Sequence, residues 1–191
     1  MSADYLVNPA IFLIDTLFNL YTFALLFRFL LQWVDADYYN PISQFLIRVT
    51  HPPLRFLRRV IPSLGRVDMA SLLLMLILQG MDVYFVFLVQ GHSPTLGMLM
   101  VLGLVQLLEM SFNLFFFAIV IRAVLSWVGS GSYKLAVSLL YSLTEPMLRR
   151  SRKLLPPMGG IDLSPMLPLV GIQLAKMIIL PPLQQIAMML G

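Results

Sequence analysis

Four apolar stretches, each long enough to cross a lipid bilayer as a helix, constrain this chain more than any other feature of its sequence. They are residues 7–34, 69–90, 96–127 and 163–190. The hydrocarbon core of a bilayer needs about 20 apolar residues of helix. With 59% hydrophobic and only 12% charged residues, too few charges remain to cover a water-exposed globule. The sequence therefore predicts an all-α membrane protein with four transmembrane helices, and excludes soluble enzymes and nucleic-acid-binding domains.

Ten of the thirteen basic residues lie in the two connections that follow the first and third apolar stretches. They are Arg48, Arg55, Arg58, Arg59, Arg66, Lys134, Arg149, Arg150, Arg152 and Lys153. The residues before the first stretch, the connection 90–95 and the C-terminal end contain no lysine or arginine. Because basic loops are retained in the cytoplasm, this pattern predicts that both basic connections are cytoplasmic and both termini periplasmic.

The chain contains an internal repeat at an offset of 94 residues. Residues 18–68 align without a gap with residues 112–162, and 19 of the 51 aligned positions are identical. Each unit contains two spans, an even number, so both units insert in the same direction. The sequence thus predicts two parallel two-helix repeats, residues 1–94 and 95–191, related by a pseudo-two-fold axis along the membrane normal.

Each unit carries a segment between its two spans, residues 41–61 and 133–155, with apolar side chains at helical spacing. We expect each segment to form an amphipathic helix at the cytoplasmic interface, with its basic side chains on the anionic headgroups of the bilayer. Docking of an acidic cytoplasmic partner on the same basic surface is the alternative.

Two turn or cap signals recur in both units. A Thr-x-Pro sequence predicts that a second short helix starts within each interfacial segment, with the threonine as its N-cap. An aspartate after a Pro-x-x-Gly turn predicts the N-cap of the returning span. These residues are Thr50, Pro52 and Asp68 in the first unit and Thr144, Pro146 and Asp162 in the second. A Pro181–Pro182 pair predicts that the last span kinks or ends there.

An arginine and a tryptophan five residues apart close the first span of each unit. Tryptophan prefers the headgroup level and arginine can snorkel to phosphates, so these pairs are predicted to anchor the spans, with coupling or lipid binding as the alternative. Together with the basic interfacial side chains they form the set expected to face lipid or a partner. That set is Arg28, Trp33, Arg55, Arg58, Arg59, Arg122, Trp127, Arg149, Arg152 and Lys153.

Polar side chains inside the predicted spans are candidates for function, because ionisable groups are costly there. They are Asp15, Asn19, Asp82, Glu109, Asn113 and Lys176. Asp82 and Lys176 occupy equivalent positions of the two units with opposite charge. We predict that they face each other, directly or through Glu109. Such a contact either locks the two halves together or forms a polar track for an ion or a proton.

The sequence offers no catalytic or metal-binding constellation. It has no cysteine, and its two histidines, His51 and His92, are predicted to lie on opposite sides of the membrane. No nucleophile elbow, phosphate-binding loop or HExxH motif occurs. We therefore expect no enzymatic activity, no cofactor and no nucleic-acid partner.

The doubled pattern Arg-x4-Trp, Thr-x-Pro-x-Leu-Arg and Pro-x-x-Gly-x-x-Asp resembles the YggT family of small integral membrane proteins. The second unit resembles the family signature closely. The first unit departs from it, with His51 in place of a glutamate and Ala70-Ser71 in place of Ser-Pro. The two-unit length resembles the proteobacterial form. The resemblance implies a bacterial inner-membrane location and roles linked to osmotic and potassium stress, cell division or nucleoid organisation, and cytochrome assembly in chloroplasts.

Two classes of function follow. In the first, the protein is a non-enzymatic scaffold or assembly and stress-tolerance factor that binds partner proteins or anionic lipids through its basic cytoplasmic helices. In the second, it is a channel or transport protein for K⁺ or H⁺, or a regulator of one, in osmotic adaptation. Four spans enclose little space, so conduction would require oligomers or the Asp82–Lys176 track. Another membrane protein or a second copy of the chain is the expected protein partner.

Overall fold

The computed structural model describes residues 4–65, 67–128, 134–154 and 162–191. Its helices are α1 (Asp4–Trp33), α2 (Pro41–Leu57), α3 (Met69–Val89), α4 (Leu96–Val128), α5 (Lys134–Leu154) and α6 (Met166–Met189). Within these ranges, all regular structure is helical apart from one isolated bridge between Leu64 and Val67. Four of the helices, α1, α3, α4 and α6, are long and apolar enough to cross a membrane. The predicted all-α membrane architecture with four spans is confirmed.

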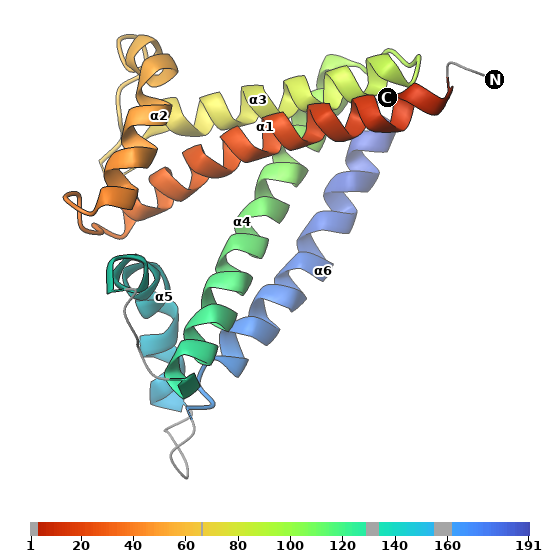
Figure 1. Ribbon diagram of the computed structural model, residues 1–191. Helices are drawn as coiled ribbons and strands as arrows, with labels where there is room; N and C mark the ends of the chain where they lie inside the picture. Colours follow the sequence, from red (N-terminus) through yellow and green to blue (C-terminus); the bar gives the residue numbers. More distant parts are fainter. Residues whose placement is uncertain (1–3, 66, 129–133, 155–161) are drawn as a thin grey trace.

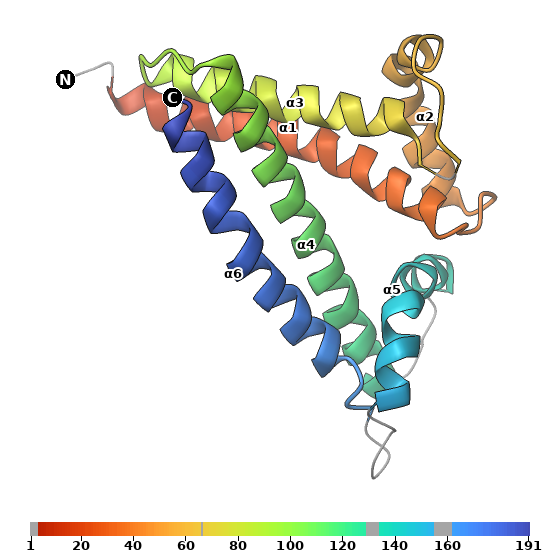
Figure 2. The ribbon, with the colours of Figure 1, turned by 180° about the vertical axis from the view of Figure 1, so that it is seen from behind.

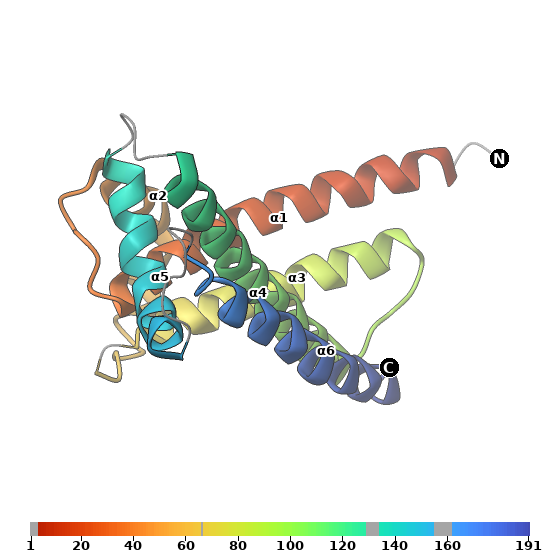
Figure 3. The ribbon, with the colours of Figure 1, turned by 90° about the horizontal axis from the view of Figure 1, so that it is seen from below.

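The four long helices form two antiparallel pairs that diverge like the arms of a V (Figure 1). α1 packs along α3, and α4 packs along both α6 and α3. The start of α1 and the end of α6 lie at the closed end of the V, and α2 and α5 lie at its open end (Figure 2). Seen from below, α2 and α5 gather beside each other at that end (Figure 3), where they are in contact. Both basic helices therefore lie on one side of any membrane that the spans cross.

The main core lies toward the open end and draws on five helices. Its buried members include Leu25 of α1, Leu54 of α2, Met75 of α3, Leu114 of α4 and Leu143 of α5. The short helices thus complete the core instead of lying apart from it.

The outward faces of the spans remain apolar, as lipid contact requires. Leu17 of α1 is 67% exposed and Ile178 of α6 is 68% exposed. In water, faces of this kind would lead to aggregation. Their exposure fits a protein whose long helices are surrounded by hydrocarbon.

Local capping determines where α2 begins. The Asn40 side chain accepts a hydrogen bond from the Ile42 N–H at 2.9 Å, and Pro41 occupies the first helical turn. The side-chain amide of Asn40 also donates to the Leu135 carbonyl at 2.8 Å. One side chain therefore caps α2 and ties it to the start of α5.

The two aspartates that were predicted as N-caps differ. Asp68 caps α3, accepting hydrogen bonds from the N–H and the hydroxyl of Ser71 at 3.4 and 2.6 Å, which confirms the prediction. Asp162 accepts from the N–H of Ser164 at 3.0 Å, but α6 begins later, with Pro165 at the cap position. The prediction for Asp162 is wrong, because the Ser164–Pro165 turn separates it from the helix.

The threonine–proline signals do not start new helices. α2 runs unbroken through Pro52 and Pro53, and α5 runs through Pro146. The Thr50 hydroxyl donates to the Leu46 carbonyl at 2.7 Å, one turn back, as expected of a residue inside a helix. The predicted N-caps at Thr50 and Thr144 are therefore wrong.

A side chain of α1 compensates for Pro53, one of the two prolines inside α2. Pro53 has no N–H to donate to the carbonyl of Val49. The Tyr21 hydroxyl of α1 donates to that carbonyl at 3.4 Å instead. Similarly, α6 continues through Pro181 and Pro182 to Met189, so the last span does not end at the proline pair.

The predicted pseudo-two-fold axis is not confirmed by the packing of the four long helices. Such an axis would pair α6 with α1 as closely as α3 is paired with α4. Among the described helices, α3 and α4 pack extensively, but α1 and α6 show no comparable contact. The four long helices therefore pack in the order α1, α3, α4, α6.

Candidate functional site

In each repeat, an arginine near the end of a long helix bonds to a threonine of the short helix that crosses it. Nη1 of Arg28 donates to Oγ1 of Thr50 at 2.6 Å, and Nη1 of Arg122 donates to Oγ1 of Thr144 at 2.8 Å. Both threonines are fully buried, and the two arginines are only 8% and 4% exposed. The prediction that Arg28 and Arg122 lie on the surface that faces lipid or a partner is wrong, since both are buried and the crossing helix supplies an acceptor inside the protein.

In the second repeat a carboxylate completes this arrangement. Glu145 accepts from Nη2 of Arg122 at 2.5 Å and from Nη1 of Arg152 at 3.3 Å. The guanidinium carbon of Arg122 also lies 4.2 Å from the centre of the Tyr141 ring, within cation–π range. The hydrogen bond from Arg122 lowers the pKa of Glu145 below its ordinary value. Arg122 is therefore both paired with a carboxylate and packed on an aromatic ring.

Each repeat also has an ion pair that closes the turn leading into its second span. Arg58 pairs with Asp68, and Arg152 pairs with Asp162 at 3.4 Å. Burial acting alone would raise the pKa of Asp68, but hydrogen bonds from Arg58 and Ser71 bring that pKa below its ordinary value. Burial alone would also raise the pKa of Asp162, but hydrogen bonds from Ser164 and Arg152 bring that pKa below its ordinary value.

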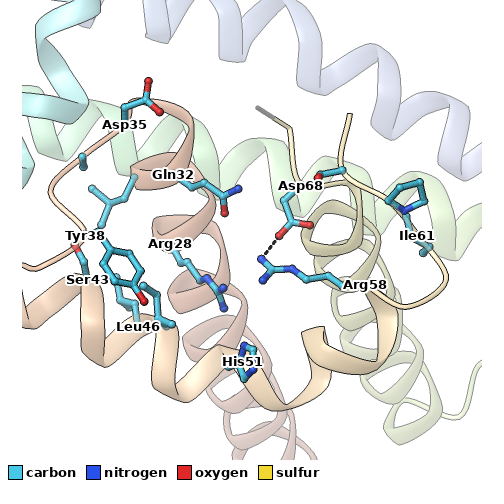
Figure 4. A pocket seen from close by; sticks show the side chains of 15 residues that line it. Arg28, Gln32, Asp35, Tyr38, Ser43, Leu46, His51, Arg58, Ile61 and Asp68 are labelled. Atoms are coloured by element: carbon cyan, nitrogen blue, oxygen red, sulfur yellow. Dashed lines mark hydrogen bonds and ion pairs between the residues drawn. The ribbon is translucent and has the colours of Figure 1, made fainter. Parts of the chain in front are cut away.

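The first repeat has a pocket of about 790 Å³ beside the equivalent arginine pair, Arg28 and Arg58. Figure 4 shows Arg28 and Arg58 entering it from α1 and from the end of α2, with His51 close to both and Asp68 bonded to Arg58. His51 occupies the position equivalent to Glu145. The pocket thus contains the arginine pair without the carboxylate that joins the pair in the second repeat.

The remaining basic candidates lie on the outside of α2, α5 and the turn after α2. Arg55, Arg58, Arg59, Arg149 and Lys153 are exposed, and Arg152 is half-buried. Trp33 is 51% exposed at the end of α1, in agreement with a position at the headgroup level. The side chain of Trp127 lies outside the described part of the chain.

The predicted direct contact between Asp82 and Lys176 is wrong, whereas the contact of Lys176 with Glu109, part of the predicted alternative, is present. Nζ of Lys176 lies 2.8 Å from Oδ1 of Asn113 and 3.6 Å from Oε1 of Glu109, both on α4. The carboxylate of Asp82 is buried and has no hydrogen bond to a described donor. The reason is that α4 lies between α3 and α6, so equivalent positions in the two repeats do not meet.

The other intramembrane polar groups pair within their own repeat. The Gln79 side chain donates to Oδ1 of Asn19 at 3.2 Å, joining α3 to α1. A second pocket, of about 580 Å³, lies between α1, α4 and α5 and includes Asn19, Gln106, Glu109 and Asn113 among its lining. Polar atoms of both repeats therefore border one cavity, although Asp82 is not among its lining residues.

Sequence reasoning missed Glu145 and Tyr141 as partners of Arg122. A signal was present, because the repeat alignment places His51 opposite Glu145 and Ile47 opposite Tyr141. These two differences mark where the repeats diverge around a shared arginine. In the described residues, no group of three histidine, aspartate or glutamate side chains could hold a metal ion.

The fold and its site define a class: a multi-pass helical membrane protein built from two similar units, each with a buried arginine–threonine contact beneath a basic helix. A sequence profile for the family described as CCB3/YggT matches the chain twice, over residues 7–89 and 101–183. The chain belongs to the CCB3/YggT family, as its sequence pattern indicated.

Individual relatives agree with this assignment. The chain is 42% identical to "Uncharacterized protein YggT" of Escherichia coli strain K12 over 161 residues, which cover 84% of each chain. It is 38% identical to an uncharacterised protein of Pseudomonas aeruginosa over 175 residues, covering 91% of this chain and 89% of the relative. No solved structure matches this chain.

Proposed function

We propose that the protein is a non-enzymatic scaffold or assembly and stress-tolerance factor of the bacterial inner membrane, which binds anionic lipids or partner proteins through its basic helices. The observation that carries this proposal is the gathering of exposed arginines and lysines of α2 and α5 at one end of the bundle. A basic surface next to a bilayer attracts anionic headgroups or acidic protein segments.

The same distribution supports an orientation. The basic helices lie at one end of the long helices and both termini lie at the other. By the positive-inside rule, the end with α2 and α5 is cytoplasmic and the termini are periplasmic. Exposed apolar side chains beside the arginines, such as Phe45 and Phe56 of α2 at 63% and 66%, would enter the interface.

Affinity capture of the full chain in mild detergent tests whether the basic surface binds partners. The capture compares the natural chain with a variant in which Arg55, Arg59, Arg149 and Lys153 are changed to glutamine. We expect a stoichiometric protein partner or co-purified anionic lipid with the natural chain, and much less with the variant. Equal recovery from both would remove the basic surface as the binding site.

The second candidate is conduction of K⁺ or H⁺, and the cavity between α1 and α4 favours it. Asn19, Gln106, Glu109 and Asn113 give that cavity polar atoms at membrane depth. Ion flux into proteoliposomes containing the purified full chain separates the two candidates. A K⁺ or H⁺ flux that Glu109→Gln abolishes would support conduction. Impermeability to both ions would exclude conduction and favour the scaffold function.

A further inference from the structure

The two repeats place the same pair of arginines around a central position, but different residues occupy that position. Arg28 and Arg58 of the first repeat correspond to Arg122 and Arg152 of the second. In the second repeat, Glu145 binds both arginines of its pair. The second repeat therefore shows that an anionic group fits between these two guanidinium groups and bonds to both.

In the first repeat, the buried guanidinium of Arg28 is poorly satisfied. An arginine side chain carries five N–H donors. Among the described residues, the hydrogen-bond acceptor of Arg28 is the Thr50 hydroxyl. Arg28 is only 8% exposed to solvent. The aromatic ring that covers Arg122 is also missing, because Ile47 stands where the second repeat has Tyr141.

The opposite wall of the pocket supplies a second cation. Arg58 points into the pocket toward Arg28 while it bonds to Asp68 (Figure 4). Asp35 also borders the pocket, but Figure 4 shows its carboxylate at the rim, directed away from both arginines. Asp68 bonds to Arg58, whereas the hydrogen-bond acceptor of Arg28 among the described residues is the uncharged Thr50 hydroxyl.

We propose that this pocket binds a phosphate oxyanion between Arg28 and Arg58, at the place that the Glu145 carboxylate fills in the second repeat. The ligand is either the phosphodiester of an anionic phospholipid or free phosphate. This inference deepens the lipid-binding part of the proposed function, but it depends on different residues from the exposed basic surface.

The dimensions and depth of the pocket suit this ligand. A volume of about 790 Å³ holds a phosphate with an attached headgroup. Arg28 lies five residues before Trp33, about 7.5 Å along the helix axis, which places the pocket beside the headgroup layer. An arginine can bind the oxygens of a phosphodiester through two parallel hydrogen bonds.

Reciprocal substitutions between the repeats test the site. His51→Glu places in the first repeat the carboxylate that the second repeat already has, so it should occupy the pocket from within. Glu145→His should empty the equivalent position of the second repeat and create another site. His92→Glu is the matched control, because His92 is an exposed histidine in the connection at the opposite end of the bundle.

The measurement is native mass spectrometry of the purified full chain, titrated with dimyristoyl phosphatidylglycerol or dimyristoyl phosphatidylcholine. We expect the natural chain and His92→Glu to retain one phosphatidylglycerol tightly, His51→Glu to bind it at least tenfold more weakly, and Glu145→His to retain a second. Equal retention by the natural chain and His51→Glu would overturn the proposal. So would equal retention of the two lipids by the natural chain.

A parallel arm uses inorganic phosphate to identify the source of the anion. If phosphate at millimolar concentration displaces the retained lipid or raises thermal stability in the natural chain but not in His51→Glu, the site accepts free phosphate. If only phosphatidylglycerol binds, the site is a lipid site. If neither phosphate nor phosphatidylglycerol binds, the proposal is overturned. Glu145→His is expected to gain a binding site, and a variant that fails to fold cannot produce that result.

The exposed basic surface is tested separately with Arg55→Gln/Arg59→Gln. Loss of salt-sensitive lipid association in that variant, with the single tight lipid retained, would support the proposed function and the pocket independently. If lipid association is unchanged in Arg55→Gln/Arg59→Gln but the tight lipid is lost in His51→Glu, the exposed basic surface does not bind lipid. The phosphate site in the pocket is then supported without it.

Discussion

Arg28 of α1 donates a 2.6 Å hydrogen bond to the hydroxyl of Thr50 of α2, and the same contact recurs between Arg122 and Thr144 at 2.8 Å. In both repeats the arginine is buried where the short helix crosses the long one. This contact fixes the short basic helix on the span beneath it. It also brings the guanidinium groups to the edge of the sites described above.

Replacing Thr50 by valine keeps the shape of the side chain and removes the acceptor of Arg28. Because a hydrogen bond to a charged group is worth about 1.5–3 kcal/mol, we expect Thr50→Val to lower the free energy of unfolding by about 2 kcal/mol. Thr144→Val should cost less, since Arg122 keeps Glu145. Thermal unfolding in detergent, followed by circular dichroism, measures both losses.

Thr16→Val is the control for these variants. Thr16 is exposed, and its hydroxyl donates to the carbonyl of Phe12 in its own helix. We expect a change of less than about 0.5 kcal/mol, the usual range for surface substitutions. A loss at Thr16 as large as that at Thr50 would show that the buried contact has no special role.

Asp68 both caps α3 and pairs with Arg58, and two substitutions separate these roles. Asp68→Ala removes the cap and the charge, and should cost about 2 kcal/mol, because an N-cap alone contributes about 1 kcal/mol. Asp68→Asn keeps a capping oxygen and should cost less. Equal losses in the two variants would assign the whole effect to the ion pair with Arg58.

The stability of the protein should fall in acid. The pKa values of Asp68 and Glu145 are lowered in the folded protein from ordinary values of 3.8 and 4.5. The unfolded chain therefore binds protons first, so the stabilisation is complete above those ordinary values and is lost as the pH falls below them. Unfolding midpoints between pH 6 and pH 3 should decline for the natural chain and decline less for Glu145→Gln. A midpoint that is constant across this range would contradict the prediction.

A double-mutant cycle tests which intramembrane groups interact. Lys176 of α6 contacts Glu109 at 3.6 Å, and Asp82 belongs to α3, which packs against α4. The cycle Glu109→Gln/Lys176→Met should give a coupling of about 0.6 kcal/mol, the average for polar pairs between transmembrane helices. The cycle Asp82→Asn/Lys176→Met should give a coupling near zero. A larger coupling between Asp82 and Lys176 than between Glu109 and Lys176 would support the direct contact predicted from the repeat.

The sequence predicted the features that depend on composition and length. The four spans agree closely with the structure, with predicted starts at residues 69 and 96 where α3 and α4 begin. A continuous apolar run of this length has few alternatives to a membrane-spanning helix. Asp68 was also predicted correctly, because its cap depends on residues only a few positions away.

The failures depend on neighbours that are distant in sequence. α2 continues past Pro53 because Tyr21, which lies in another helix, donates to the carbonyl that the proline leaves free. Arg28 points inward because Thr50 of α2 offers an acceptor. The tendency of arginines at span ends to snorkel to phosphates takes no account of such a partner. The Asp82–Lys176 pairing failed because an internal repeat shows which positions are equivalent, but not which helices are adjacent.

The central claim is that the end of the bundle formed by α2 and α5 binds anionic phosphate groups. The most direct measurement is the lipid composition around the full chain extracted into polymer nanodiscs, for the natural chain and for Arg55→Gln/Arg59→Gln/His51→Glu. We predict that phosphatidylglycerol is enriched over the bulk membrane around the natural chain and returns to the bulk proportion around the variant. A bulk proportion of phosphatidylglycerol around both proteins would contradict the claim.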